Sequence, residues 1–509
     1  MRGNWQPKPG DKIIHRPRVK AHPLRRVLGV PGLFSAGYGN VGSSIYYALG
    51  IVALIAMGAT PIVLAIAGIF FIFTALTYAE GTAMLPEAGG SASFARRGFG
   101  DLAGFVSGWA LMLSYIVTIA ISAFVIPPYL GYFWPVLKES AFVSTTVSMG
   151  IIFFLMIINV VGVKETSFLN VAAAILDLLV QLLIIVLGLL IVFNFDVLVH
   201  NITFYWPSLD SLILGIALAA IAYTGVETMS QMAEETKQPS RKVPKALVLM
   251  VITVLVLFSG VSTVALSAMT PQELATSWAA DPIAGIAHVI SLAITPGEIA
   301  AGFSSEEAVV IVLTWIFTGL RDLLPAVVAI LAASILFIAT NAGLMGISRL
   351  AFSLGRFQLI PPALGRVHDR FKTPYMSIIL FAAIALLILV PGFFAPDMFI
   401  NLGVLYAFGS LLSFSMAHAS ILSLRVRSPD ASRPFKIGGS IKIKQYELPI
   451  TAILGLVGTM IIWVVVLLTQ PYSRWVGLGW MAIGLIVYFL YRWRRRLPLR
   501  QVPEVDNQA

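Results

Sequence analysis

Residues 39–50 read GNVGSSIYYALG, and this stretch decides the fold. It places glycine, serine and tyrosine inside an apolar run, residues 30–57, that is long enough to cross a bilayer. Glycine weakens a helix and serine side chains compete with the backbone for hydrogen bonds, so we expect the helix to break here. A break frees backbone N–H and C=O groups, which a membrane tolerates only where they line a polar cavity. The sequence therefore predicts a binding site inside the first membrane span.

The composition is that of a protein that crosses the membrane many times. The chain has 509 residues, of which 58% are hydrophobic and only 11% are charged, against roughly a quarter charged in soluble domains. Its mean hydropathy is +0.90. The first 26 residues are polar and basic, so no cleavable signal peptide is expected. The chain has no cysteine, which excludes disulfides and thiolate metal sites.

Twelve apolar segments are long enough to span a bilayer. They cover residues 30–57, 62–85, 103–134, 143–162, 168–194, 211–232, 246–268, 324–354, 374–392, 398–424, 450–469 and 474–492. If the N-terminus lies inside, 31 of the 34 Lys and Arg residues fall on the cytoplasmic side, and only Lys138, Arg321 and Arg474 lie outside. The positive-inside rule thus predicts a protein of the cell (plasma) membrane with both termini cytoplasmic. The net charge of +10 follows from this asymmetry and does not indicate a nucleic-acid partner.

This arrangement divides the chain into a transport core and its flanking segments. We expect a basic cytoplasmic tail (1–28), a ten-helix core (29–424), a cytoplasmic loop (425–449), two further helices (450–493) and a second cytoplasmic tail (494–509). The only long loop, 269–323, would lie outside. Its apolar stretches 283–294 and 308–320 are too short to span, so we expect two surface helices over the external mouth.

A second interruption falls in the sixth span. Residues 220–247 read AIAYTGVETMSQMAEETKQPSRKVPKAL, and the apolar pattern stops at Gly225 and Glu227. Paired interrupted helices in corresponding positions indicate an inverted-repeat transporter with its site near the middle of the membrane. The predicted fold class is an all-α membrane protein with twelve transmembrane helices. It would be a five-plus-five inverted repeat with discontinuous helices 1 and 6, followed by two extra C-terminal helices.

Four stretches resemble one known family, the amino acid–polyamine–organocation (APC) permeases, which share the LeuT fold. They are VGSSIY at 41–46, YAEGTAMLPEAGGSASFARRGFG at 78–100, GVE at 225–227 followed by EETKQPSRKVPKA at 234–246, and ATNAGLMGISRLAFSLGRFQLIPPALGRV at 339–367. The resemblance covers residues 29–424 and implies the LeuT-type architecture. Ser44 departs from the family, which usually has a second glycine there. Its side chain is expected to narrow the gap through which backbone groups meet a ligand.

The two interruptions supply the predicted substrate-binding residues. Half-helix N-termini would hold a carboxylate, and unwound carbonyls would hold an ammonium group. The residues are Val41, Gly42, Ser43, Ser44, Ile45, Tyr46, Tyr223, Thr224, Gly225 and Glu227. For Glu227 two interpretations stay open, and one residue can satisfy both. The resemblance implies a proton-sensitive link between helices six and one, whereas the helix dipole favours an acid that caps the second half-helix.

Two further residues are predicted to carry ion coupling, Asp177 in span five and Asn341 in span eight. A carboxylate in the hydrocarbon region is costly, so Asp177 is a functional hypothesis by default. It shares a helix face with Asn170 and Gln181, and it could exchange a proton, ligate a cation or make a structural hydrogen bond. In some members of the resembling family a lysine on helix five replaces a coupling sodium ion, and Asp177 falls near that position. Asn341 lies on a polar stripe that could line an ion path or hold helices together.

The favoured function is a secondary-active transporter, a symporter or exchanger of amino acids or related small organic amines that works by alternating access. Proton coupling is preferred to sodium, because span eight reads FIATNAG from residue 337 and has no adjacent Ser/Thr pair near Asn341. Four acids at the cytoplasmic edge are expected to pair with Arg96, Arg97 or Lys237 and hold the inward-closed state. These acids are Glu80, Glu87, Glu234 and Glu235.

The sequence offers little for other classes of function. It has no His pair with metal-ligand spacing, no phosphate-binding glycine loop and no convincing catalytic constellation. No metal, cofactor or enzymatic activity is therefore expected. An inorganic-ion carrier on the same fold and a non-transporting solute sensor are the alternatives.

Overall fold

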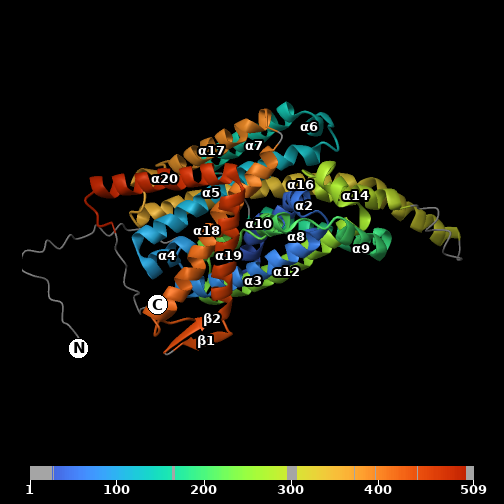
Figure 1. Ribbon diagram of the computed structural model, residues 1–509. Helices are drawn as coiled ribbons and strands as arrows, with labels where there is room; N and C mark the ends of the chain where they lie inside the picture. Colours follow the sequence, from blue (N-terminus) through green and yellow to red (C-terminus); the bar gives the residue numbers. More distant parts are fainter. Residues whose placement is uncertain are drawn as a thin grey trace, which may run out of the picture.

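The computed structural model describes residue 26 and residues 28–499, except for 163–166, 295–306, 372, 396 and 444. In chain order the helices are α1 (Val30–Val41), α2 (Ile45–Ala56), α3 (Thr60–Met84), α4 (Ser91–Phe99), α5 (Asp101–Leu130), α6 (Val136–Glu139), α7 (Ala141–Val161), α8 (Ser167–Leu187), α9 (Phe195–Phe204), α10 (Leu209–Ala222), α11 (Val226–Gln231), α12 (Pro239–Ala268), α13 (Pro271–Thr276), α14 (Pro282–Ala293), α16 (Glu307–Arg356), α17 (Tyr375–Leu389), α18 (Met398–Arg427), α19 (Ile450–Thr469) and α20 (Pro471–Arg494). Short 3-10 turns cover Gly42–Ser44, Met57–Ala59, Ala233–Glu235, Pro362–Gly365 and Val390–Phe393, and a π-helical turn covers Gly188–Val192. A two-stranded antiparallel hairpin, β1 (Ser440–Ile443) and β2 (Tyr446–Pro449), contacts α18 and α19 (Figure 1).

Eleven helical stretches in the described chain are long and apolar enough to cross a membrane. The predicted spans 30–57 and 62–85 both fall in the first stretch, Val30–Met84. Within it, Met57 has a φ of +47° between α2 and α3, which ends the α-helical hydrogen bonding of α2. The expected all-α membrane class is confirmed, and the remaining predicted spans coincide with the other ten stretches to within a few residues, apart from the longer α16 and from α12, which starts at Pro239 instead of residue 246.

Helices α5 and α18 form the centre of the molecule, where both are almost wholly buried. Small residues let neighbouring helices approach them closely, as is usual between membrane helices. A Cβ on Gly346 of α16 would lie 2.6 Å from the Tyr115 ring of α5, so only glycine fits there. The outer helices α7, α8 and α19 expose large apolar side chains such as Phe154, Leu179 and Ile461, which suits a surface in contact with lipid.

Several helix ends carry the chemistry expected of them. Ser140 and Ser208 cap the N-termini of α7 and α10, and their side-chain oxygens accept from backbone N–H groups three residues on. Gly162 ends α7 with a φ of +73°, a left-handed conformation that glycine adopts at little cost. These capping residues explain why α7 and α10 begin, and why α7 ends, at the observed positions.

The first span is interrupted, but not in the way that the sequence predicts. Residues Gly42–Ser44 form a 3-10 turn between α1 and α2, and their backbone stays right-handed helical instead of unwinding. The hydroxyls of Ser43 and Ser44 both donate to the carbonyl of Asn40, at 3.0 and 3.2 Å. Because these side chains bond back to the preceding turn, the change is one of helix type and frees few backbone groups.

The sixth span is fully interrupted, and here the prediction is confirmed. Helix α10 ends at Ala222, Gly225 has a φ of +127°, and α11 starts at Val226. A residue with a Cβ would be strained at this φ, so the conformation depends on glycine.

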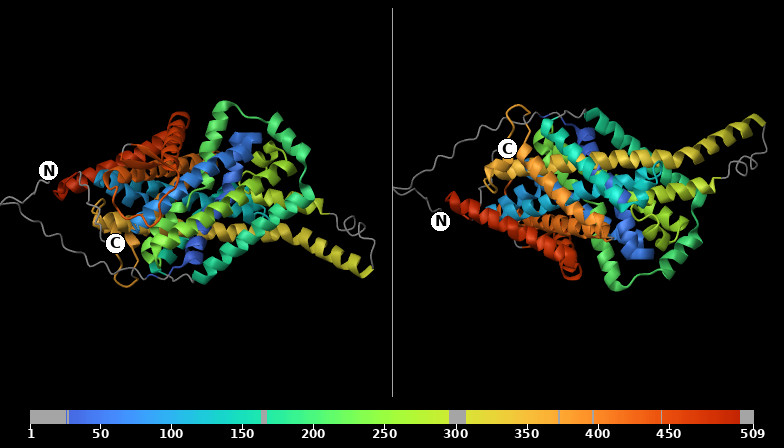
Figure 2. Two further views of the ribbon diagram at one scale, coloured as in Figure 1. Left: turned by 90° about the horizontal axis from the view of Figure 1, so that it is seen from below. Right: turned by 90° about the horizontal axis from the view of Figure 1, so that it is seen from above.

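The expectation for the loop after α12 is half right. Helix α14 coincides with the predicted surface helix 283–294. Stretch 308–320 is not a separate surface helix, because α16 continues through it from Glu307 to Arg356 and projects beyond the other helices (Figure 2). Arg321 and Asp322 interrupt the apolar pattern, but they do not interrupt backbone hydrogen bonding, and the helix continues past them.

Candidate functional site

The interruptions of the first and sixth spans lie directly against each other. A Cβ on Gly225 would lie 2.5 Å from Cγ2 of Val41 and 3.1 Å from the Val41 backbone nitrogen. Close by, the side-chain amide of Asn40 donates a 3.1 Å hydrogen bond to the Thr228 hydroxyl. The structure therefore brings the two halves of the predicted site together through a glycine contact and one polar link.

Glu227 lies at the start of the second half-helix, α11. Its Oε2 accepts a 3.0 Å hydrogen bond from the backbone N–H of Gly225, and its side chain is buried. This is the capping arrangement that the helix dipole favours. Within the described residues no Lys or Arg forms an ion pair with Glu227, so its charge is uncompensated when it is ionised.

Asp177 of α8 bridges the two sides of the 3-10 turn in the first span. Its carboxylate accepts hydrogen bonds from the Tyr46 hydroxyl at 2.6 Å and from the Tyr38 hydroxyl at 2.9 Å. The side chain of Gln181, one turn further along α8, donates to it at 2.8 Å and lies 3.5 Å from the carbonyl oxygen of Gly42. Asp177 is buried, and no Lys or Arg of the described chain pairs with it. The predicted polar face of span five thus faces the 3-10 turn of the first span through Asp177 and Gln181. The side chain of Asn170, the third residue on that face, lies outside the described part of the chain.

The remaining residues around the turn satisfy one another. The Ser44 hydroxyl lies 3.0 Å from the Tyr47 hydroxyl, and the Thr224 hydroxyl donates to that of Tyr406 at 2.5 Å. Val41, Gly42, Ser43, Ile45 and Tyr46 are all buried. Ser44 therefore presents its hydroxyl to a neighbouring side chain and to its own helix.

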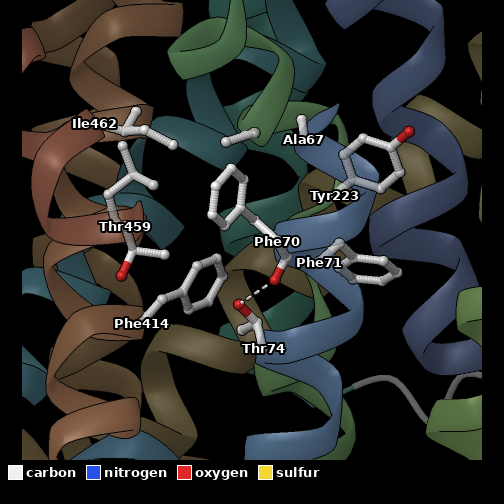
Figure 3. A pocket seen from close by; sticks show the side chains of 10 residues that line it. Ala67, Phe70, Phe71, Thr74, Tyr223, Phe414, Thr459 and Ile462 are labelled. Carbon is white, nitrogen blue, oxygen red and sulfur yellow. Dashed lines mark hydrogen bonds between the residues drawn. The ribbon is translucent and has the colours of Figure 1, made fainter. Parts of the chain in front are cut away.

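Two predicted site residues make hydrogen bonds to residues outside this cluster. The Tyr223 hydroxyl donates to the Leu64 carbonyl at 2.9 Å, and its ring faces an apolar crevice between α3, α10, α18 and α19 (Figure 3). Asn341 of α16 accepts a 2.5 Å hydrogen bond from Asn159 of α7. For Asn341 this hydrogen bond is a link between α7 and α16.

Sequence reasoning missed four residues that shape the site. Tyr38 hydrogen-bonds to Asp177, and Asn40 hydrogen-bonds to Thr228. Tyr406 hydrogen-bonds to Thr224. The Tyr129 hydroxyl donates to the Tyr46 carbonyl at 2.8 Å. The residues are Tyr38, Asn40, Tyr129 and Tyr406. A buried phenol usually needs a partner, so a tyrosine in an apolar run is the signal that could have found three of them.

The acids at the predicted cytoplasmic edge are paired, but mostly with other partners than expected. The pair between Glu87 and Arg97 is confirmed at 3.0 Å. Glu80 pairs with Arg425, Glu234 with Arg356 and Glu235 with Arg349, while Arg96 pairs with Asp101. The expected pairing of these three acids with Arg96 or Lys237 is therefore wrong, because the arginines that bind them come from distant parts of the chain.

Fold and site together define a membrane transport protein built of apolar helices, with two interrupted spans meeting in its core. The chain belongs to the amino acid permease family, which matches residues 28–490. The branched-chain amino acid permease BcaP of Bacillus subtilis is 27% identical over 492 residues, which cover 92% of this chain and 93% of that protein. The methylthioribose transporter of the same organism is 27% identical, covering 96% and 98%. The low-affinity putrescine importer PlaP of Escherichia coli is 24% identical, covering 91% and 92%. The expected class, a secondary transporter of amino acids or related organic solutes, is confirmed.

Proposed function

We propose that this permease couples the transport of an amino acid or a related small amine to protons through Asp177. The single observation that supports this role is the position of the Asp177 carboxylate between Tyr38 and Tyr46, on both sides of the turn in the first span. A buried ionised carboxylate with no cationic partner is costly in a membrane, so it gains a proton readily. The names of the relatives support the substrate class, since they include a branched-chain amino acid permease and a putrescine importer.

Protonation of Asp177 would change what holds the first span to α8. An ionised carboxylate accepts all three hydrogen bonds from Tyr38, Tyr46 and Gln181, and bonds to a charged acceptor are about twice as strong as neutral ones. A protonated carboxyl has one donor and weaker acceptors, so at least one of these bonds must weaken or reverse. Proton binding thereby loosens the first span from α8, which is the kind of coupling that alternating access needs.

The architecture completes the proposal. If α1 and α2 together count as the first span and α3 counts as the second, the protein has twelve transmembrane spans. Spans 1–5 and 6–10 form the two halves of the repeat, and each half begins with an interrupted span. Helices α19 and α20 follow as spans 11 and 12. The distribution of basic residues supports a topology in which the ends of the chain and the β1–β2 hairpin lie on the cytoplasmic side of the plasma membrane. A bundle of spans 1, 2, 6 and 7 would rock against the rest, with substrate held at residues 41–46 and 224–227.

Uptake by purified protein in liposomes tests this function. Labelled leucine, putrescine and methylthioribose are offered with an inward proton gradient, with the gradient collapsed by an ionophore, and with sodium replaced by choline. We expect leucine or putrescine to accumulate, only with the proton gradient and equally without sodium. Accumulation that requires sodium contradicts the proton assignment, and uptake of methylthioribose alone, or of none of the three, contradicts the substrate class.

A further inference from the structure

A group of buried polar atoms without partners lies apart from the interruptions. Gln231 is the last residue of α11, and neither atom of its side-chain amide has a hydrogen-bond partner within the described chain. The hydroxyls of Ser93 on α4 and Ser353 on α16 likewise have none among described residues. All three residues are buried. Each unpaired buried group costs about 1–3 kcal/mol, so several near one point need an explanation.

Two adjacent glycines pack against these three side chains. A Cβ on Gly89 would lie 2.2 Å from the Ser93 hydroxyl oxygen and 3.2 Å from that of Ser353, so both hydroxyls face the same point. Gly90, with a φ of +52°, comes next, and a Cβ there would lie 3.9 Å from Cγ of Gln231. The two serine hydroxyls and the Gln231 side chain therefore lie along the same backbone turn, from which no side chain projects.

An ion pair links the 3-10 turn that follows α11 to the end of α16. Glu234 follows Gln231 by three residues and Arg356 follows Ser353 by three, and the two form a 2.7 Å ion pair. Glu234 also accepts a 3.0 Å hydrogen bond from the backbone N–H of Ala88, beside the glycine pair. Both charged side chains still reach solvent, at 21% and 27% exposure, so this ion pair lies between the unpaired groups and the surface.

On the other side, the same helix leads to the predicted substrate site. Thr228 precedes Gln231 by three residues on α11 and bonds to Asn40 of the first span. The unpaired groups therefore lie between the interrupted helices and the Glu234–Arg356 pair.

We propose that Gln231, Ser93 and Ser353 form an inner binding site for the transported solute on its path between the central site and the cytoplasm. The proposal rests on the proposed transport function. The three groups are uncharged and can each donate and accept, so they suit the carboxylate and ammonium ends of a small zwitterion or amine alike. Water could make the same hydrogen bonds, and the experiment must separate the two ligands.

Labelling of a single cysteine tests the inner site, since the chain has no cysteine of its own. Ser353→Cys, with Ser93→Cys as a second position, is treated in open membrane fragments with the thiol reagent 2-aminoethyl methanethiosulfonate. Leucine, putrescine and methylthioribose are tested as protecting solutes. We expect one of them to slow labelling at both positions. Adding Gln231→Leu should weaken the apparent affinity of that solute for protection by about tenfold, the effect of about one lost hydrogen bond.

Two control variants at Gln445 and a reference cysteine at position 44 distinguish binding at the inner site from other causes of altered labelling. Gln445→Cys, exposed in the hairpin turn, should label quickly without protection, and Gln445→Leu should leave protection at Ser353→Cys unchanged. Ser44→Cys reports the central site. Protection at position 44 but not at 353 or 93 means that only water enters the inner position, which rejects the inner site and leaves the transport function standing. Protection at no position by any of the three solutes rejects both proposals.

Discussion

The hydroxyl of Tyr46 donates a 2.6 Å hydrogen bond to the carboxylate of Asp177, which lies 131 residues further along the chain. Tyr38 makes the matching bond from the other side of the 3-10 turn at 2.9 Å. One buried carboxylate thus holds both halves of the first span against α8. Its charge state therefore decides how firmly the first span is held.

Asp177→Asn should abolish gradient-driven accumulation. The variant keeps the size and a hydrogen-bonding group, but it is neutral at every pH and cannot carry a proton. Exchange of labelled for unlabelled solute should survive, because it needs binding but no net proton movement. Uptake into liposomes with and without a pH gradient measures both properties.

Asp196→Asn is the matched control, since it makes the same change at an exposed residue of α9. It should behave as wild type. If Asp177→Asn still accumulates solute with the wild-type pH dependence, Asp177 is structural, and Glu227 becomes the first candidate for coupling.

Gly225→Ala should destabilise the protein and stop transport. The backbone φ of +127° strains any residue with a Cβ, and the new methyl group would lie 2.5 Å from Val41. Strain and overpacking together should cost at least about 2 kcal/mol. A lower thermal unfolding midpoint in detergent, read by tryptophan fluorescence, measures the effect.

Gly150→Ala is the control for this change, because nothing lies within 4 Å of the added methyl group on α7. Alanine favours a helix over glycine by about 1 kcal/mol, so this variant should be unchanged or slightly more stable. A Gly225→Ala variant as stable as Gly150→Ala would show that the interruption of the sixth span does not depend on glycine.

Arg425→Met should be strongly destabilising. Arg425 binds Glu80 through two 2.6 Å hydrogen bonds, and both side chains are buried. Removing one partner of a buried ion pair costs about 3–5 kcal/mol when the remaining charge has no other partner. Here Arg433 lies 3.5 Å from the Glu80 carboxylate and stays in place, so we expect a loss below the top of this range. The double variant with Glu80→Gln should recover part of this loss, which thermal unfolding of all three proteins would show. Arg427→Met, exposed in the same last turn of α18, should have little effect, and equal losses for the two arginines would contradict the ion-pair explanation.

Local chemistry made part of the site predictable. The interruption at Gly225 follows from a glycine among polar residues in an apolar run, and Asp177 stands out because carboxylates are rare inside membrane spans. The position of the first-span interruption was predicted correctly, but its conformation was not, because the chain forms a 3-10 turn there instead of unwinding. Glycine and serine only weaken a helix, and in this fold Ser43 and Ser44 bond back to Asn40, which keeps the turn helical.

The rest depends on contacts between distant segments. Glu80 and Arg425 are 345 residues apart, and nothing local marks them as partners. The bonds from Tyr38 and Tyr46 to Asp177 depend on how α8 lies against the first span, which no periodicity records. The length of α16 escaped prediction for another reason, because Arg321 and Asp322 end the apolar pattern without ending the helix.

The pH dependence of stability should reveal the buried carboxyl of Asp281. Asp281, just before α14, lies 2.7 Å from the ammonium group of Lys138, which in turn lies 4.1 Å from the centre of the Trp278 ring. Burial raises the pKa of Asp281, and the nearby Lys138 opposes this rise without cancelling it. A carboxyl with a raised pKa binds its proton more tightly in the folded protein than in the unfolded chain.

The contribution of Asp281 to stability is therefore fully present below the ordinary pKa of Asp, about 4, and is lost as the pH rises through the raised pKa. Across this window the unfolding midpoint of the wild type should fall relative to that of Asp281→Asn, which stays neutral throughout. Asp210→Asn removes an exposed carboxylate at the start of α10 and should keep the wild-type dependence. If wild type and Asp281→Asn show parallel midpoints from pH 4 to pH 7, proton binding at Asp281 is not coupled to folding.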